Sequence, residues 1–257
     1  MNYTLITGAS SGIGLELSHL LADAGNNLIL VARKEKDLYE LKTSLTKKYN
    51  IFVEVIKTDL GNPSAPKEIY DEITSKGMSV DTLINNAGVG SFGPFSEISL
   101  EKDINLIDVN VRALTELTKL FIPHLLEQKK GRILNVASTA GFMPGPYMAV
   151  YYASKAYVIS FSEALSSELE GTSVTVSVLC PGPTKTGFQA KAEMKKSDFV
   201  TLGVMDAKTV ALCGYKGMLK GKTIIIPGYL NKLLILGGKL MPRKLLTALA
   251  KSTQKVN

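Results

Sequence analysis

Short apolar runs alternate along this chain of 257 residues with longer segments in which apolar residues recur at helical spacing. The run Leu28-Ile29-Leu30-Val31 is apolar at every position, which is typical of a strand buried on both faces of a sheet. Strands separated by helices predict right-handed crossovers, and hence an α/β fold with a parallel sheet covered on both faces. We expect strands at 3–7, 27–32, 51–58, 82–85, 132–137, 174–180 and 223–226, and helices beginning near Gly12, Lys34, Pro63, Leu100 and Tyr151.

The length fits one large domain over residues 1–257, because no linker-like stretch or repeat divides the chain. Residues 181–221 exceed an ordinary crossover, so we expect a substrate-loop insertion there, helical in pieces. Every apolar run is shorter than the ~18 residues of a membrane-spanning helix, and two cysteines give no disulfide framework. A strand begins almost at Met1, without a leader, so we expect a cytoplasmic protein.

A glycine-rich turn follows the first strand, reading Thr7-Gly8-Ala9-Ser10-Ser11-Gly12-Ile13-Gly14. Gly8 permits a tight turn, while Gly12 and Gly14 let the backbone approach a phosphate and let the helix pack on the strand. The first N–H groups of that helix would then face an anion. This arrangement suits a dinucleotide pyrophosphate, although a plain strand-to-helix turn remains the alternative.

The loops after six predicted strands carry residues with distinctive chemistry. In an open α/β sheet, ligands bind beyond the carboxyl ends of the strands, so these loops are expected to converge on one crevice. The residues in question are Gly8, Arg33, Asp59, Asn86, Ser138 and Pro181.

The second strand ends in Ala32-Arg33-Lys34, where NAD-binding proteins commonly place an acid on the ribose 2′-hydroxyl. A guanidinium at this point can instead bind a 2′-phosphate through two hydrogen bonds. We therefore favour NADP(H) over NAD(H). The alternative is that Arg33 is a solvated base at a helix start.

Tyr151 and Lys155 form the Y-x-x-x-K pattern, which places a phenol and an ammonium on one helix face. A nearby cation is expected to lower the pKa of the phenol, which can then exchange a proton with a carbonyl or alcohol oxygen. Ser138, just after a strand, can hold the same oxygen, although it could be a simple strand-end serine. Asn110 interrupts a predicted helix, where its low helix propensity suggests a local kink.

These motifs together resemble the short-chain dehydrogenase/reductase family. The matching elements are T-G-x-x-x-G-I-G at 7–14, N-N-A-G at 85–88, Asn110, Ser138, Y-x-x-x-K at 151–155 and P-G-x-x-x-T at 181–186. Their order and spacing agree from residue 3 to about residue 186. A narrower likeness, to bacterial carbonyl and 3-oxoacyl reductases, rests on the general character of the sequence.

The resemblance implies a single Rossmann-type, doubly wound domain with a seven-stranded sheet of order 3-2-1-4-5-6-7. It makes Tyr151 the general acid/base, Lys155 the ribose ligand and proton relay, Ser138 the substrate-orienting residue and Asn110 the anchor of a relay water. Asp59 would bind the adenine amino group, or else cap a turn. The expected cofactor contacts are Gly8, Ser10, Ser11, Gly12, Ile13, Gly14, Arg33, Asp59, Leu60, Asn86, Ala87, Gly88, Tyr151, Lys155, Pro181, Gly182, Thr184 and Thr186.

The expected activity is NADP(H)-dependent hydride transfer between the nicotinamide and a carbonyl or secondary alcohol, as reduction of an apolar ketone or 3-oxoacyl group. The alternative is a sensor or scaffold that binds NADP(H) without turnover. Relatives pair subunits through helices near Leu100 and Tyr151, so we expect a homodimer or homotetramer. Apolar residues expected near the substrate are Phe92, Phe95, Phe142, Met143, Phe188, Phe199 and Met205.

The net charge of +7 comes from the C-terminal part, because no acidic residue follows Asp206. Residues 228–257 form a basic, leucine-rich extension. The simplest interpretation is an amphipathic helix packed on its own body or a sister subunit; the others are a lid for an anionic acyl carrier or CoA thioester, and an adaptor that docks on an anionic membrane. Without a reading motif, nucleic-acid binding is not expected. His19 and His124 lie in predicted helices away from the crevice, and no metal site is expected.

Overall fold

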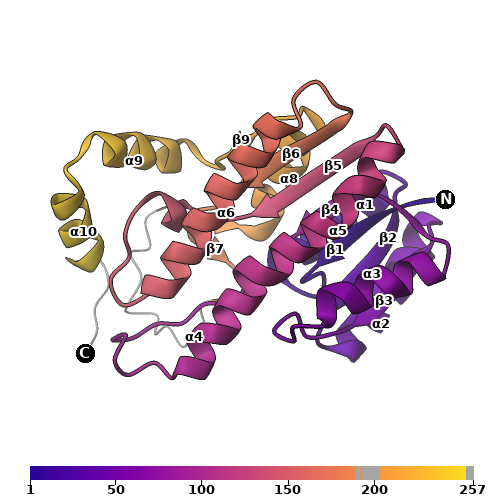
Figure 1. Cartoon of the computed structure of the whole chain (residues 1–257), viewed down its shortest axis with the longest axis horizontal. Coiled ribbons are helices and arrows are strands. Elements are labelled where there is room, and N and C mark those ends of the chain that lie inside the picture. Colours follow the sequence, from indigo (N-terminus) through magenta and orange to yellow (C-terminus); the bar gives the residue numbers. More distant parts are fainter. Residues whose placement is uncertain (189–191, 193–202, 253–257) are drawn as a thin grey trace.

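The computed structural model of the protein describes residues 1–188, 192 and 203–252. Seven parallel strands form one sheet in the order β3-β2-β1-β4-β5-β6-β9 (Figure 1). The predicted order 3-2-1-4-5-6-7 is confirmed, because β9 is the seventh strand of this sheet along the chain. The strands are β1 (Asn2–Thr7), β2 (Asn27–Ala32), β3 (Val53–Lys57), β4 (Ser79–Asn85), β5 (Gly131–Val136), β6 (Val174–Leu179) and β9 (Ile224–Ile225).

Helices cover both faces of the sheet. Those on one face are α1 (Gly12–Asp23), α2 (Glu35–Tyr49) and α8 (Ala207–Leu219). Those on the other are α3 (Ala65–Ser75), α5 (Leu114–Glu127) and α6 (Ala149–Glu168). The continuous apolar run of β2 explains this layering: Leu28 and Leu30 enter the core under α1, whereas Ile29 and Val31 enter the core under α3 and α5.

Asn110 lies in a widened helical turn. The helix α4 (Leu100–Ile107) passes into the π-helical turn η1 (Asp108–Ala113), which continues into α5. Single π turns inside helices are frequent at functional sites. The kink predicted at Asn110 is therefore present as this turn, and Asn110 itself is buried.

The segment after β6 is more regular than expected. The two-residue strand β7 (Thr184–Lys185) pairs with β8 (Met205–Asp206), and α8 then forms an ordinary crossover helix packed against α1. Asp206 starts α8 by accepting the Thr209 N–H at 2.7 Å, and this bond lowers the pKa of Asp206. Within the insertion predicted at 181–221, residues 207–219 thus form a helix of the layer that covers the sheet. Phe199 lies outside the described residues.

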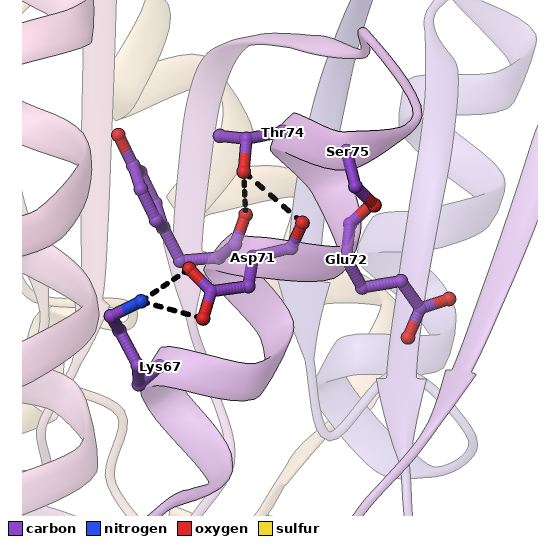
Figure 2. Close-up of polar contacts among 6 residues, drawn as sticks. Lys67, Asp71, Glu72, Thr74 and Ser75 are labelled. Atoms are coloured by element: carbon purple, nitrogen blue, oxygen red, sulfur yellow. Dashed lines mark hydrogen bonds and ion pairs between the residues drawn. The ribbon is translucent and has the colours of Figure 1, made fainter.

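The solvent face of α3 shows how exposed helices are supported locally. In Figure 2 the Lys67 ammonium contacts both carboxylate oxygens of Asp71 one turn later, and the Thr74 hydroxyl donates to the Asp71 carbonyl. Exposed pairs of this spacing contribute only about 0.3–0.5 kcal/mol each. The buried side chains of α3, Ile69 and Ile73, attach the helix to the sheet.

Two helices end the described chain, α9 (Tyr229–Leu240) and α10 (Arg243–Ser252), and stand at one end of the molecule (Figure 1). Most of their leucines are exposed and do not pack on the protein's own body, which leaves a sister subunit, a lid and membrane docking as the interpretations of this apolar face. None of the helices in the described part of the chain has the length and apolar character needed to cross a bilayer.

Candidate cofactor and catalytic site

The glycine turn between β1 and α1 has the conformation that its sequence requires. Gly8 and Gly12 adopt φ values of +66° and +56°, which disfavour any other residue. A Cβ on Gly14 would lie 2.3 Å from the Gly8 carbonyl oxygen and 2.4 Å from Asn86 Nδ2. The turn is therefore packed tightly against the loop after β4, and its shape depends on the absence of side chains.

Thr7 and Asn86 join the ends of β1 and β4. The Thr7 hydroxyl accepts the backbone N–H groups of Asn86 and Ala87 at 3.0 Å, and Asn86 Nδ2 donates to the carbonyls of Thr7 and Gly8 at 2.9 and 3.2 Å. The sequence analysis placed Asn86 at this edge of the sheet, whereas the part played by Thr7 was missed. The role of Thr7 could have been inferred from its position, because it is the last residue of its strand and the first of the glycine motif.

The N-terminus of α1 is open towards the site. Ser11 precedes the helix and, within the described structure, its side chain makes no capping bond and the first turn contains no acid. Thr186, from the loop after β6, lies 3.1 Å from the place where a Cβ on Gly12 would stand. Free helical N–H groups beside glycines form an anion-binding cradle, so these residues fit a dinucleotide pyrophosphate.

Arg33 and Asp59 meet beyond the ends of β2 and β3. Arg33 Nη1 lies 3.6 Å from Asp59 Oδ2, and both side chains are about half exposed. Asp59 Oδ1 also accepts the Gly61 N–H at 3.0 Å, which makes a local turn and not a cap on α3. The guanidinium keeps donor groups available to solvent, where a phosphate could reach them. The adjacent Leu60 is buried.

Tyr151 and Lys155 are both buried on one face of α6, as their spacing predicts. Lys155 Nζ donates to the Val136 carbonyl at the end of β5, at 2.9 Å, and lies 5.8 Å from the centre of the Tyr151 ring. Ser138, two residues beyond β5, accepts the Ala140 N–H at 3.1 Å and donates to the Pro181 carbonyl at 3.4 Å, and it lies near enough to Tyr151 to influence its pKa. The structure therefore brings the three predicted side chains together.

The expected lowering of the Tyr151 pKa by Lys155 is wrong for this chain. Burial raises the pKa of Tyr151 to about 12, because it disfavours the phenolate, and the nearby Ser138 hydroxyl opposes this shift only in part. Burial also lowers the pKa of Lys155 to about 8. Sequence spacing placed the two groups on one face but gave no measure of how deeply both are buried.

The depressed pKa of Lys155 predicts a rise of stability with pH. Between pH 8 and 10.5 the native chain has released a proton that the unfolded chain still binds, so the free energy of unfolding increases on the order of 3 kcal/mol across this window. Lys155→Met should remove this increase, whereas Lys119→Met, at an exposed site on α5, should keep it. Urea unfolding of the three proteins at several pH values measures the difference, and equal slopes would contradict it.

The amide of Asn110 fixes the loop after β4 to the catalytic helix. Its Oδ1 accepts the Val89 N–H and its Nδ2 donates to the Val89 carbonyl, both at 2.9 Å. The same Nδ2 donates to Ser154 Oγ at 3.1 Å, and Ser154 donates to the Tyr151 carbonyl at 2.7 Å. Gly88 lies between Asn110 and Lys155, since a Cβ on Gly88 would lie 3.4 Å from both Asn110 Oδ1 and Lys155 Nζ. The sequence analysis missed Ser154, whose place inside the Y-x-x-x-K motif was the signal.

The loop after β6 closes the other side of the site. The Pro181 carbonyl accepts the Thr139 N–H at 2.8 Å and so holds this loop against the loop of Ser138. Asn231 of α9 fills the space above Gly182, where a Cβ would lie 2.5 Å from Asn231 Oδ1. The Thr184 hydroxyl donates to the Gly182 carbonyl at 2.9 Å. The shape of this loop therefore depends on α9 as well as on its own prolines.

Apolar side chains surround the Tyr151 ring. Phe188 lies 5.3 Å from it between ring centres, and Phe92 packs in the same cluster. Phe142 and Met143 line a neighbouring cavity of about 400 Å³ that reaches Arg243 of α10. Two of the expected substrate-side residues lie elsewhere: Phe95 is exposed, and Met205 packs against the core under α1.

The histidines lie where the sequence placed them. His19 is in α1, and His124 of α5 contacts the Ser79 hydroxyl at 3.3 Å through Nε2. Among the residues that the structure describes, no cluster of three His, Cys, Asp or Glu side chains can hold a metal ion. Cys180 is buried, and burial raises the pKa of its thiol to about 12.

Comparison with known proteins agrees with this geometry. The family model described as short chain dehydrogenase matches residues 2–197. Sulfoacetaldehyde reductase 2 of Chromohalobacter salexigens is 37% identical over 186 residues, which cover 72% of this chain and 73% of that protein. The ketoacyl reductase HetN of Nostoc is 31% identical over 245 residues, which cover 93% and 84%.

A solved structure is also similar over nearly the whole chain. The short-chain dehydrogenase from Sphingobium yanoikuyae in complex with NADPH is 30% identical and superimposes with a TM-score of 0.83, covering 93% of each chain. Both the sequence and the fold are similar to those of known short-chain dehydrogenases. The chain therefore belongs to the short chain dehydrogenase family, whose members are oxidoreductases.

Proposed function

We propose that the protein is an NADP(H)-dependent reductase of apolar ketones or 3-oxoacyl groups. The observation that carries the proposal is that the buried Tyr151 and Lys155 meet the half-buried Ser138 beside the glycine turn. Two of the similar proteins are named as reductases, one of them a ketoacyl reductase, and the similar structure holds NADPH. The apolar cluster around Tyr151 supports an apolar substrate.

The cofactor would lie along the carboxyl edge of the sheet. The N-terminus of α1 and the glycines 8, 12 and 14 would hold the pyrophosphate, with Ser10, Ser11 and Ile13 beside it. The further contacts that we propose are Arg33, Asp59, Leu60, Asn86, Ala87, Gly88, Tyr151, Lys155, Pro181, Gly182, Thr184 and Thr186. When bound, the nicotinamide supplies the hydride for the carbonyl carbon.

Side chains of the protein would donate the proton to the carbonyl oxygen and replace it afterwards. Ser138 would donate a hydrogen bond to the carbonyl oxygen, and Tyr151 would donate its phenolic proton to the same oxygen as the alcohol forms. A Tyr151 pKa of about 12 keeps that phenol protonated at neutral pH, which suits the reductive direction. Lys155, with a pKa of about 8, would return a proton towards Tyr151, and Asn110 would hold the loop after β4 against the helix that carries both residues.

Arg33 supports the preference for NADP(H). Arg33→Ala should raise the Kd for NADPH by about 10- to 100-fold, because one charge-assisted contact to the 2′-phosphate is worth about 1.5–3 kcal/mol. The Kd for NADH should stay within about twofold, since NADH lacks that phosphate. Lys36→Ala, an exposed base in α2, is the matched control. Calorimetric titration of both nucleotides tests this, and an unchanged ratio of the two Kd values would contradict the assignment.

The reaction itself is tested by NADPH oxidation with a panel of ketones and 3-oxoacyl thioesters. Turnover of apolar members is expected. The second candidate, a dinucleotide sensor without turnover, is favoured if NADPH binds tightly and no carbonyl compound increases its oxidation. The grouping of Asn110, Ser138, Tyr151 and Lys155 in one site supports the enzyme, because a sensor does not need a proton relay.

We also propose a homodimer or homotetramer formed through α4 and α6. Apolar side chains are exposed on this surface, and a cavity of about 430 Å³ lies between the two helices and η1. Its lining includes Ile107, Val111, Val150, Ala153 and Tyr157. Light scattering of the intact chain should give at least twice the mass of one chain.

A further inference from the structure

The two C-terminal helices expose an unusual number of large apolar side chains. Eight of them are between 39% and 83% exposed. Water-exposed apolar surface on this scale commonly marks an interaction site. The side chains are Tyr229, Leu230, Leu233, Leu234, Leu236 and Leu240 of α9, and Leu245 and Leu249 of α10.

The opposite sides of these helices are attached to the body of the protein. Asn231 and Ile235, one turn apart, are buried, and Asn231 Nδ2 donates to the Pro227 carbonyl at 2.8 Å. Ala250 is buried in α10, and Leu246 of α10 lies 3.5 Å from where a Cβ on Gly238 of α9 would stand. Asn231, Ile235 and Ala250 thus face the body of the protein, while most of the leucines face outward.

The charge of this region is of one sign. Beyond Asp206 the chain has no acidic residue, and ten basic residues follow. Within α9 and α10, Lys232 and Lys244 are exposed near the leucines. The ten residues are Lys208, Lys216, Lys220, Lys222, Lys232, Lys239, Arg243, Lys244, Lys251 and Lys255.

Leucines and lysines on short, firmly held helices suit the interface of a bilayer that contains anionic lipids. Apolar side chains can enter the boundary between headgroups and acyl chains while lysine ammonium groups reach the phosphates. At 12 and 10 residues, α9 and α10 are too short to span a bilayer. A second copy of the chain suits this surface less well, because pairing it with itself would bring together two basic helices without acids.

We propose that α9 and α10 form a docking surface for an anionic lipid bilayer, with the exposed leucines inserted and the lysines on the headgroup phosphates. Two lysines of α9 and α10 also contact aromatic residues near the proposed substrate site. Lys239 Nζ lies 5.9 Å from the Phe142 ring centre, and Lys251 Nζ lies 6.0 Å from that of Tyr147. Docking is independent of catalysis, so either proposal can fail alone.

The test is sedimentation of the intact chain with vesicles of phosphatidylcholine alone or with about one third phosphatidylglycerol. The wild type should sediment with the anionic vesicles and stay in the supernatant with the neutral ones. Leu234→Gln combined with Leu245→Gln should weaken binding about tenfold, since both side chains are exposed and their loss costs little packing. Leu219→Gln, an equally exposed leucine at the end of α8, is the matched control.

The charge requirement is tested in the same assay. Lys232→Gln with Lys244→Gln should also weaken binding about tenfold, whereas Lys36→Gln on α2 should not. Circular dichroism and NADPH binding confirm that each variant is folded. The proposal is overturned if the wild type sediments with neither kind of vesicle. It is also overturned if the leucine variant binds the anionic vesicles as tightly as the wild type does. Light scattering adds a further outcome: a dimer that the leucine variant converts to monomer, without vesicle binding, would assign this surface to a second copy.

Discussion

Tyr151→Phe is expected to lower kcat for carbonyl reduction by about 10²–10⁴-fold, which is the usual contribution of a positioned general acid. The substitution removes one hydroxyl and keeps the ring, which packs edge-on against Tyr152 and beside Phe188. The fold and the affinity for NADPH should therefore change little. Steady-state kinetics with a substrate found in the carbonyl panel, together with a separate titration of NADPH, measures the two effects.

Tyr157→Phe is the matched control for that experiment. Tyr157 lies on the same helix, stacks on Phe161 and shares a hydrogen bond of 2.9 Å with the Thr115 hydroxyl. The Tyr157 hydroxyl has no part in the proposed proton transfer. Its removal should therefore change kcat by no more than about threefold, as for most surface changes. Equal rates for wild type and Tyr151→Phe would remove Tyr151 from the mechanism.

Gly14→Ala should raise the Kd for NADPH by at least about 100-fold and lower the melting temperature. Its Cβ would stand 2.3 Å from the Gly8 carbonyl oxygen, so the helix start or the turn must move. The neighbouring atoms are backbone and the amide of Asn86, which is itself held by Thr7. Such overpacking typically costs about 1–3 kcal/mol of stability, and it displaces the N–H groups that would face the pyrophosphate.

A second glycine in a helix serves as the control, because replacing it with alanine changes helix propensity without creating a clash. Gly237 in α9 has no atom within 4 Å of a built Cβ, so Gly237→Ala should gain only the better helix propensity of alanine, up to about 1 kcal/mol. Thermal unfolding with and without NADPH compares the two variants. If Gly14→Ala keeps the full stabilisation by NADPH, the glycine turn is not the pyrophosphate site.

The layered sheet was predictable because six of its seven strands have five to seven residues, are largely apolar and are separated by helices. The strand predicted at 27–32 has those bounds in the structure, since its run of buried residues ends at Arg33. The order of the sheet came from the family resemblance and is also confirmed. In contrast, β7 and β8 contain two residues each, and so short a pair leaves no periodic pattern to detect.

The sequence predicted which residues group together at the candidate site, but not the pKa values of their side chains. The loops of Gly8, Asn86 and Ser138 converge as the strand ends required, and Lys155 faces the same side of α6 as Tyr151. The pKa of Tyr151 was predicted in the wrong direction, because burial depth depends on the packing of several distant segments. The hydrogen bonds of Thr7 and Ser154 depend on backbone positions that spacing alone does not specify.

Transfer of deuterium tests the central claim most directly. Wild-type protein is mixed with the carbonyl panel and NADPH that carries deuterium at the transferable C4 position, and the products are examined by mass spectrometry. We predict an alcohol that gains one deuterium at the former carbonyl carbon, formed about 10²–10⁴-fold more slowly by Tyr151→Phe. Tight NADPH binding with no labelled alcohol from any carbonyl compound would contradict the account and favour a sensor.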